Sequence, residues 1–441
     1  MIVEGWLPRA AAARPGGMAL QTPHGSSSYA ELLAGACAGA AELAARGAQP
    51  GRRVAIVLPP GLAFAQALHA CLLLGAVAVP VDPRLLGAER ETIAAGAVVH
   101  VEEPLLIEAH PPRPPGSAVV DRYAGARHDL AATAVVIHTS GTTSAPKPVE
   151  LTYGNLLWSA LGSAVALGLD PRERWLCALP LAHVGGLSIL LRSTIYATTA
   201  VLHERFDTDA VLDALREQDI TLISVVATTL ARLLDAMPAH PEHLPSLRCA
   251  LTGGGPVPAA LIERAASRGV PVALTYGLTE ACSQVTTGGP PLFCTRVRVT
   301  ADGEILVAGP TVAPGSLHAD GWLHTGDLGA LDERGRLFVT GRKADTIVSG
   351  GENVAPAEVE AVLEAHPDVL EAAVLPRPDE RWGEAVAAIV VPRPGSALAA
   401  ETLRAHCAAH LARYKVPKQV DFTGTPLPRT RSGKLLRRNL S

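Results

Sequence analysis

The chain has 441 residues, which is too long for one ordinary hydrophobic core, so we expect two or three domains. Hydrophobic residues make up 48% and charged residues 18%, a composition that excludes wholesale disorder. The formal net charge of −4 provides no basic field for binding nucleic acid.

The cysteines indicate a reducing, cytoplasmic environment, because their number is odd and no two form a C-x-x-C pair. This pattern argues against a disulfide framework and against a zinc site. The seven cysteines are at positions 37, 71, 177, 249, 282, 294 and 407. Residues 1–6 lack the basic and apolar regions of a signal peptide. The most apolar stretch, residues 62–81, is interrupted by polar residues, Gly75 and Pro80, so we predict a buried helix and then a strand, with no membrane span.

Strand and helix patterns alternate along most of the chain. We predict strands at 53–58, 76–79, 134–137, 175–179, 198–202, 221–225, 247–251 and 272–275. We predict helices from 62, at 153–166, from 186, and at 211–216, 228–235 and 258–266. Such repeated units imply parallel sheets with helices on both faces.

The pattern changes twice in the last third of the chain. From residue 296 short β segments with Asp-Gly and Arg-Gly turns predict a small β subdomain. After residue 342 we predict a compact α+β tail, with helices near 356–364 and 397–411 and strands near 370–375 and 385–391. The predicted class is α/β: an N-terminal domain over 1–341 with two doubly wound sheets and the β subdomain, a hinge at 342–345, and a small mobile C-terminal domain over 346–441.

Residues 138–147, HTSGTTSAPK, are the most informative segment, because five hydroxyl residues surround Gly141 directly after a predicted strand. Backbone N–H groups and hydroxyls of such a loop can surround a polyphosphate, with Lys147 as a point charge. An ordinary Ser/Thr/Gly turn is the alternative from the residues alone. A P-loop is disfavoured, because Pro146 and Pro148 flank the lysine and predict extended chain where that motif requires a helix start.

Five further segments carry residues suited to chemistry. Residues 275–280, TYGLTE, follow a predicted strand, and Glu280 either holds Mg²⁺ or merely favours a first helical turn. The triple glycine in residues 251–256, LTGGGP, either lets a flat ligand approach the backbone or forms a tight turn. In residues 322–327, WLHTGD, Asp327 is either an acceptor for ribose hydroxyls or an ordinary turn residue. Residues 341–345, GRKAD, are predicted to form a linker between domains. Residues 429–434, RTRSGK, are predicted to form either a basic loop or a frayed terminus.

In this order, the five motifs (hydroxyl loop, YGLTE, TGD, GRKAD and SGK) resemble those of the acyl-adenylate-forming superfamily, over roughly residues 28–438. That superfamily includes acyl- and aryl-CoA ligases, nonribosomal adenylation domains and firefly luciferase. Residues 180–193, PLAHVGGLSILLRS, and 275–284, TYGLTEACSQ, are similar to the o-succinylbenzoate–CoA ligases of menaquinone synthesis.

The resemblance implies roles residue by residue. The β- and γ-phosphates of ATP are assigned to Thr139, Ser140, Gly141, Thr142, Thr143 and Lys147. Adenine is assigned to Gly253, Gly254, Gly255, Pro256 and Tyr276. The α-phosphate is assigned to Thr279, Mg²⁺ to Glu280, and the ribose to Asp327 and Arg342. Lys434 bridges the acyl carboxylate and the α-phosphate. The acyl side is assigned to His183, Arg192, Gly277, Ser283 and Gln284, with Gly277 also beside the nucleotide. The coenzyme A side is assigned to Ser349, Gly350 and Gly351.

Arg192 is the candidate partner for the second carboxylate of o-succinylbenzoate, because a bidentate guanidinium suits it and the surrounding run is apolar. An arginine at a helix end reaching solvent is the alternative. The sequence also departs from the superfamily pattern: Ser144 and Pro148 replace two glycines of the hydroxyl loop, and Ala344 occupies the polar hinge position. Gly185 replaces a serine common in the similar ligases.

We therefore expect an ATP- and Mg²⁺-dependent enzyme that forms an acyl-AMP and then a coenzyme A thioester. The alternatives are a ligase for another aryl or fatty acid and, from a different class, a non-catalytic nucleotide or acyl-AMP binding protein. Its partners are small molecules, with no nucleic acid and no membrane span, and a homo-oligomer is not excluded.

Overall fold

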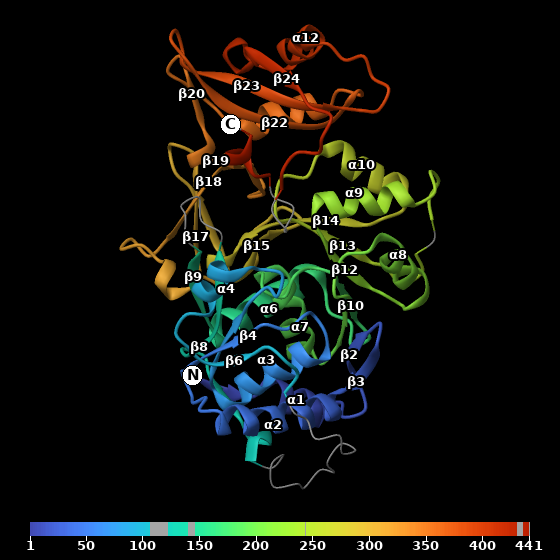
Figure 1. The fold of residues 1–441 in the computed structure, drawn as a ribbon, viewed down its shortest axis with the longest axis vertical. Helices are drawn as coiled ribbons and strands as arrows, with labels where there is room; N and C mark the ends of the chain where they lie inside the picture. Colours follow the sequence, from blue (N-terminus) through green and yellow to red (C-terminus); the bar gives the residue numbers. More distant parts are fainter. Residues whose placement is uncertain (106–121, 140–145, 243, 430–434, 441) are drawn as a thin grey trace.

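The computed structural model describes residues 1–105, 122–139, 146–242, 244–429 and 435–440. Figure 1 shows a large N-terminal part below and a smaller C-terminal part, in orange and red, above it. No helix among the described residues is long and apolar enough to cross a bilayer. All seven cysteines are free.

An eight-stranded sheet of order β15-β14-β13-β12-β10-β11-β2-β3 forms the first layer of the N-terminal part. Its six central strands are parallel, and an antiparallel strand closes each edge. The strands are β2 Met18–Thr22, β3 Gly25–Ser28, β10 Arg174–Cys177, β11 Thr199–Leu202, β12 Leu222–Val225, β13 Cys249–Thr252, β14 Val272–Leu278 and β15 Ser283–Thr287.

A five-stranded sheet of order β6-β4-β5-β8-β9 forms the second layer, parallel except for its last strand. Its strands are β4 Arg53–Ile56, β5 Val77–Pro80, β6 Ala97–Val101, β8 Thr133–Thr139 and β9 Lys147–Thr152. Two short strands, β1 Ile2–Glu4 and β7 Arg127–Asp129, pair separately. The helices are α1 Trp6–Ala13, α2 Tyr29–Ala45, α3 Leu62–Leu74, α4 Gly87–Ala94, α6 Tyr153–Leu167, α7 Val184–Tyr196, α8 Thr208–Glu217, α9 Ala227–Ala236 and α10 Ala259–Ser267.

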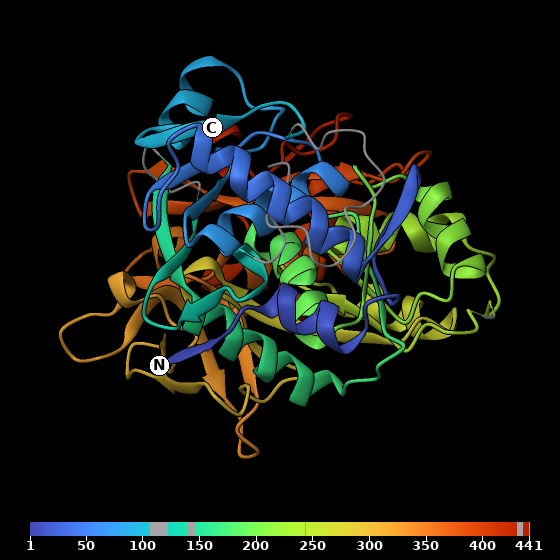
Figure 2. The same ribbon diagram turned by 90° about the horizontal axis from the view of Figure 1, so that it is seen from below.

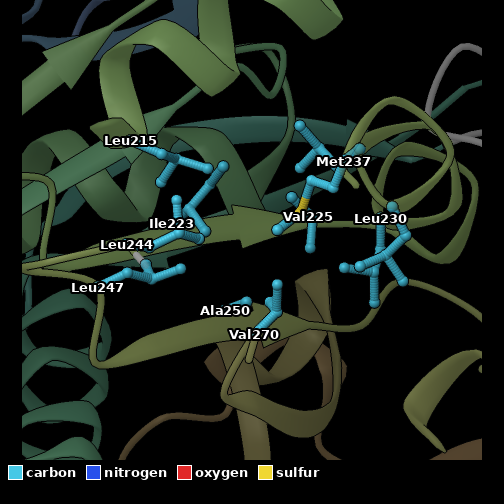
Figure 3. A pocket seen from close by; sticks show the side chains of 11 residues that line it. Leu215, Ile223, Val225, Leu230, Met237, Leu244, Leu247, Ala250 and Val270 are labelled. Carbon is cyan, nitrogen blue, oxygen red and sulfur yellow. The ribbon is translucent and has the colours of Figure 1, made fainter. Parts of the chain in front are cut away.

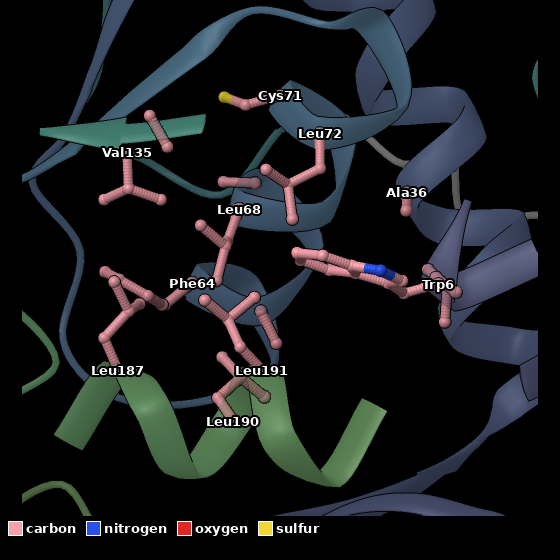
Figure 4. Close-up of a cluster of buried hydrophobic side chains, with 14 of the residues drawn as sticks. Trp6, Ala36, Phe64, Leu68, Cys71, Leu72, Val135, Leu187, Leu190 and Leu191 are labelled. Atoms are coloured by element: carbon pink, nitrogen blue, oxygen red, sulfur yellow. The ribbon is translucent and has the colours of Figure 1, made fainter. Parts of the chain in front are cut away.

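One hydrophobic core joins the two sheets. In Figure 4, Leu187, Leu190 and Leu191 of α7 point toward Phe64 and Leu68 of α3. Trp6 of α1 approaches the same cluster from the side. Figure 2 shows the blue N-terminal helices covering this end of the molecule, where α1 contacts both α2 and α7. Burial on this scale fixes the position of α7, which carries the candidate site residue Arg192 and has His183 at its N-cap.

The small β subdomain is a four-stranded antiparallel sheet, β16 Arg296–Val299, β17 Glu304–Ala308, β18 Leu323–Leu331 and β19 Leu337–Arg342. The 3-10 turn η3, Lys343–Asp345, leads from it into the C-terminal part. There a mixed sheet of β20 Ile347–Ser349, β21 Glu352–Val354, β22 Val369–Asp379, β23 Gly383–Pro392 and β24 Gln419–Phe422 packs with α11 Pro356–Glu364 and α12 Ala400–His410.

The predicted α/β class with its two sheets, β subdomain and α+β tail is confirmed. Two local expectations were wrong, and the elements of one region were not predicted at all. The first 50 residues contain three strands and two helices that the sequence patterns did not reveal. β14 continues to Leu278, three residues past its predicted end, because β15 returns antiparallel and pairs with it. β22 and β23 form a longer hairpin than expected, since their register runs from Val369 to Asp379.

Candidate active site

The candidate site lies at the carboxyl ends of the parallel strands, where open α/β sheets bind ligands. β10, β12, β13 and β14 are neighbours in one sheet, so the segments that follow them meet at one edge. His183 follows β10, the triple glycine follows β13, and Thr279 follows β14. His183 is half-buried at the N-cap of α7, and its backbone N–H donates to the Pro180 carbonyl at 3.1 Å.

The hydroxyl loop joins β8 to β9. Thr139 and Lys147 face each other in the register, and the Thr139 hydroxyl lies 3.4 Å from the Lys147 carbonyl oxygen. Lys147 begins the strand β9, which agrees with the extended chain predicted after the loop. Ser140, Gly141, Thr142, Thr143 and Ser144 lie outside the described residues, so their phosphate-binding roles stay predictions.

The backbone requires glycine at two of the three positions that follow β13, and the third glycine borders open space. A Cβ on Gly253 would lie 2.6 Å from the Thr275 carbonyl oxygen, so only glycine lets β14 approach here. Gly254 has φ +84°, which other residues rarely adopt. Gly255 borders open space, where a planar ligand has room to approach the backbone.

The YGLTE segment is divided between a strand and a turn. Tyr276 and Gly277 belong to β14, and Thr279 and Glu280 to the 3-10 turn η1, Thr279–Ala281. A Cβ on Gly277 would lie 1.6 Å from the Ser283 carbonyl oxygen, so the returning strand requires glycine there. The Glu280 carbonyl accepts from the Ala313 N–H at 2.8 Å, which anchors the turn to the segment before the β subdomain's third strand.

Tyr276, Asp327 and Arg342 form one hydrogen-bonded group. The Tyr276 hydroxyl donates to Asp327 Oδ2 at 2.8 Å, and Arg342 Nε donates to Asp327 Oδ1 at 2.9 Å. Asp327 is 6% exposed and lies opposite Arg342 in the β18–β19 register. Burial and the nearby Asp327 charge raise the pKa of Tyr276, so its hydroxyl stays protonated and donates. Tyr276, predicted to bind adenine, is therefore in direct contact with Asp327, which is predicted to bind the ribose together with Arg342.

Arg192 is buried on α7, so the solvent-exposed alternative is wrong: its exposed fraction is 3%. Its Nη2 donates to the Ser159 hydroxyl at 2.9 Å, and its guanidinium lies 5.8 Å from the Trp175 ring centroid. Nε has no partner, and no carboxylate within the described part of the chain lies in ion-pair range. Burial lowers the pKa of Arg192, because the charged form loses solvation. An anionic ligand is the missing counter-charge that this arrangement favours.

Ser283 and Gln284 begin β15, next to Gly277. The buried Gln284 side chain donates from Nε2 to the Thr287 hydroxyl at 2.9 Å, while its Oε1 has no partner among the described residues. Ser283 is half-buried and has φ +88°. Gln284 is thus held from one side and keeps a free acceptor.

The hinge segment is anchored on both sides of Ala344. Lys343 Nζ lies 2.9 Å from Asp302 and 3.2 Å from Glu304 of the β subdomain. Asp345 accepts from Arg437 Nη1 at 3.2 Å. Ala344 is therefore the one residue between an anchor to the β subdomain and an anchor to the C-terminal tail.

The predicted coenzyme A loop follows β20. Ser349 is buried, and Gly350 and Gly351 have φ +62° and +84°. A Cβ on Gly350 would lie 2.6 Å from the Trp382 ring, so Trp382 supports this loop. Lys434 lies outside the described residues. Arg429 and Leu435, which flank it in sequence, form an isolated β-bridge, and Arg429 pairs with Glu371 at 2.9 Å.

Glu280 fits a magnesium ion that arrives with a nucleotide. Its carboxylate is half-buried, and no cluster of three or more metal-ligating side chains occurs within the described ranges. Mg²⁺ is commonly held by one or two carboxylates together with substrate phosphates, so a single glutamate suffices.

The cavity in Figure 3 is separate from this site. It lies among β12, α9 and their neighbours, is lined by apolar side chains only, and has a volume of about 10 Å³. A void of that size and lining is a packing defect of the core.

Sequence reasoning missed two residues that support the site, Ser159 and Asn155 on α6. Asn155 completes the capping box of α6 with the N-cap residue Thr152, and its amide group donates to the Pro310 and Val312 carbonyls. These bonds connect the helix to the segment after β17. The spacing of Asn155 from Thr152 is a visible cap signal, but the contact with residues 310–312 has no local signature.

Comparison with known proteins identifies the family. The AMP-binding enzyme model matches residues 7–317, and the AMP-binding enzyme C-terminal domain model matches residues 358–434. The chain belongs to the AMP-binding enzyme family. The resemblance to the acyl-adenylate-forming enzymes is thereby confirmed.

Within this family, the chain is similar to known 2-succinylbenzoate–CoA ligases and to solved structures of such enzymes. The 2-succinylbenzoate–CoA ligase of Bacillus subtilis (strain 168) is 38% identical, over 99% of this chain and 97% of the relative. That of Bacillus velezensis is 40% identical, over 89% and 88%. The structure of Bacillus subtilis o-succinylbenzoate CoA synthetase (MenE) with the intermediate OSB-AMP matches with TM-score 0.89 and 36% identity, over 100% and 98%. ATP-bound MatB from Rhodopseudomonas palustris matches with TM-score 0.86 and 27% identity, over 99% and 98%.

Proposed function

We propose that this enzyme joins o-succinylbenzoate to coenzyme A, with ATP as the energy source and o-succinylbenzoyl-AMP as the intermediate. The observation that carries the proposal is the buried Arg192, whose charge has no carboxylate partner among the described residues. A monocarboxylic acid gives up its one carboxylate to the phosphate, whereas a dicarboxylic acid keeps a second for this arginine. The similar ligases named above support the same substrate.

In the first half-reaction, a carboxylate oxygen of the acid attacks the α-phosphorus of ATP, and pyrophosphate leaves. The Tyr276, Asp327 and Arg342 group holds the nucleoside, with the Asp327 carboxylate accepting from ribose hydroxyls. Thr139 and Lys147 hold the leaving pyrophosphate, and Lys434 bridges the two reacting groups. Glu280 would hold Mg²⁺, which when bound neutralises charge on the phosphates. Positioning and cationic stabilisation supply most of the rate in such displacements.

In the second half-reaction, the thiolate of coenzyme A attacks the acyl carbonyl, the anhydride C–O bond breaks and AMP leaves. Lys434 and the Gly350 loop belong to the same C-terminal domain, so one movement of that domain can exchange them at the site. We infer that the domain 346–441 rotates about the hinge 342–345, withdrawing the lysine and presenting the glycine loop. Domain rotation is an established way of separating two steps.

The proposal is tested by pyrophosphate exchange and thioester formation with o-succinylbenzoate and a panel of benzoates and fatty acids. We expect activity with o-succinylbenzoate and a rise of its KM in Arg192→Ala. Adenylation of benzoate but not of o-succinylbenzoate would refute the substrate and leave the class. Lys434→Ala should lose adenylation and retain thioester formation from preformed acyl-AMP. Since ATP and coenzyme A are cytoplasmic metabolites, we place the reaction in the cytoplasm.

A further inference from the structure

Two hydrogen bonds connect Arg192 to the turn that carries Thr279 and Glu280. Arg192 Nη2 donates to the Ser159 hydroxyl at 2.9 Å, and that hydroxyl donates to the Cys282 carbonyl at 2.6 Å. Ser159 belongs to α6, and its exposed fraction is 2%. One buried serine thus lies between the proposed acyl-recognition residue and the turn η1.

The backbone on the far side of Ser159 is strained. Cys282 has φ +53° and Ser283 has φ +88°, two consecutive non-glycine residues in the left-handed region. Such conformations cost energy and persist only where the surroundings enforce them. Here the enforcing contacts are the Ser159 hydroxyl on the Cys282 carbonyl and the Gly277 backbone, which packs against Ser283.

We propose that Ser159 is a positioning residue that sets the acyl-recognition arginine and the phosphate-side turn at a fixed separation. A serine hydroxyl accepts from the guanidinium and donates to the carbonyl in one small volume. Without it, a buried guanidinium N–H and a buried carbonyl both lose their partner, and each pays a desolvation cost. The contacts of the Ser159 hydroxyl are with Arg192 and with the Cys282 carbonyl, so Ser159 acts through Arg192 and through η1.

The inference rests on the proposed function, because its first arm requires a substrate with a second carboxylate. Loss of the Arg192 contact should weaken binding of the dicarboxylate only. Loss of the Cys282 contact should lower kcat for any acid, because Thr279 and Glu280 shift relative to the α-phosphate. The two arms therefore separate into a selective change in KM and a shared change in kcat.

The matched control is Ser163, one turn further along α6, with an exposed fraction of 1%. Within the described part of the chain no hydrogen bond joins Ser163 to Arg192 or Cys282. Ser163→Ala removes the same atom from the same buried helix face and should leave both kinetic constants within twofold of the wild type. Ser159→Cys keeps the shape of the side chain with a slightly larger atom and weakens both hydrogen bonds, and it replaces Ser159→Ala if that variant does not fold.

The experiment measures pyrophosphate exchange by these full-length variants with o-succinylbenzoate and with two monocarboxylate analogues, 4-oxo-4-phenylbutyrate and 2-butanoylbenzoate. For Ser159→Ala we expect KM for o-succinylbenzoate to rise about tenfold and KM for whichever analogue reacts to change less than twofold. We expect kcat to fall by a similar factor with both acids. The double variant Arg192→Ala/Ser159→Ala should have the KM of Arg192→Ala, because the contact is already lost.

Ser159→Ala constants equal to those of Ser163→Ala would overturn the inference. Equal rises in KM for o-succinylbenzoate and for the analogue would overturn the connection through Arg192. Inactivity of the wild-type enzyme with o-succinylbenzoate would refute the proposed function. The role of Ser159 is tested by a different measurement, the comparison of the two serine variants, so the two failures can be told apart.

Discussion

Asp327→Asn should separate the two duties of the buried carboxylate, holding its protein neighbours and binding ATP. The substitution keeps the size of the side chain and removes its charge. The amide oxygen still accepts from the Tyr276 hydroxyl, which donates at 2.8 Å in the native protein. The charge-assisted bond from Arg342 Nε, at 2.9 Å, is weakened, but nearly half of that arginine side chain is exposed to solvent.

The free energy of unfolding should therefore fall by only about 1 kcal/mol, the range of a partly solvated ion pair. The effect on ATP should be larger, because the ribose hydroxyls lose a charged acceptor. A hydrogen bond to a charged group contributes about 1.5–3 kcal/mol, which corresponds to a rise of roughly 10- to 100-fold in KM for ATP. Urea unfolding and pyrophosphate exchange measure the two quantities. Tyr276→Phe is the control, since it removes one contact to the carboxylate and keeps the charge. An unchanged KM for ATP in Asp327→Asn would refute the assignment of the ribose to this residue.

Three other predictions concern the backbone, the pH dependence and the C-terminal tail. Gly277→Ala should abolish adenylation and lower the melting temperature, because its Cβ would lie 1.6 Å from the Ser283 carbonyl oxygen; normal activity would contradict the tight packing. Burial raises the pKa of Glu364 to about 7, so the folded state holds a proton that the unfolded state releases near 4.5. The free energy of unfolding should thus fall as pH rises from 4.5 to 7, and Glu364→Gln should flatten this slope in urea titrations. Arg437 lies three residues after the predicted adenylation lysine. It pairs with Glu360 of α11 at 2.7 Å and with Asp345 of the hinge at 3.2 Å. Arg437→Ala should slow adenylation about tenfold and leave thioester formation from acyl-AMP unchanged. Lys415→Ala, which breaks another ion pair of the same domain, should change neither rate. Equal losses of both rates in Arg437→Ala would count against its role as an anchor of the hinge.

Local patterns predicted the sheets and the order of the motifs, because strand and helix periodicities repeat along the chain. The parallel class follows from that alternation, and the carboxyl-end location of the site follows from the class. The helix at 62–74 and its end at Gly75 could be predicted for the same reason: Gly75 adopts the left-handed conformation of a C-cap.

The remaining features depend on contacts between distant segments. β15 returns along β14 because Gly277 permits the approach, and no periodicity near residue 283 signals it. The burial of Arg192 depends on Ser159, 33 residues earlier, and its sequence neighbours alone left solvent exposure open. Tyr276 and Asp327 meet across 51 residues, so the sequence assigned them separate roles without showing their contact.

The most direct test of the account is product analysis after mixing the purified enzyme with o-succinylbenzoate, ATP, Mg²⁺ and coenzyme A. The account predicts one AMP and one pyrophosphate for each o-succinylbenzoyl-CoA, with acyl-AMP accumulating when coenzyme A is left out. Release of ADP and phosphate, or no thioester from this acid, would contradict it.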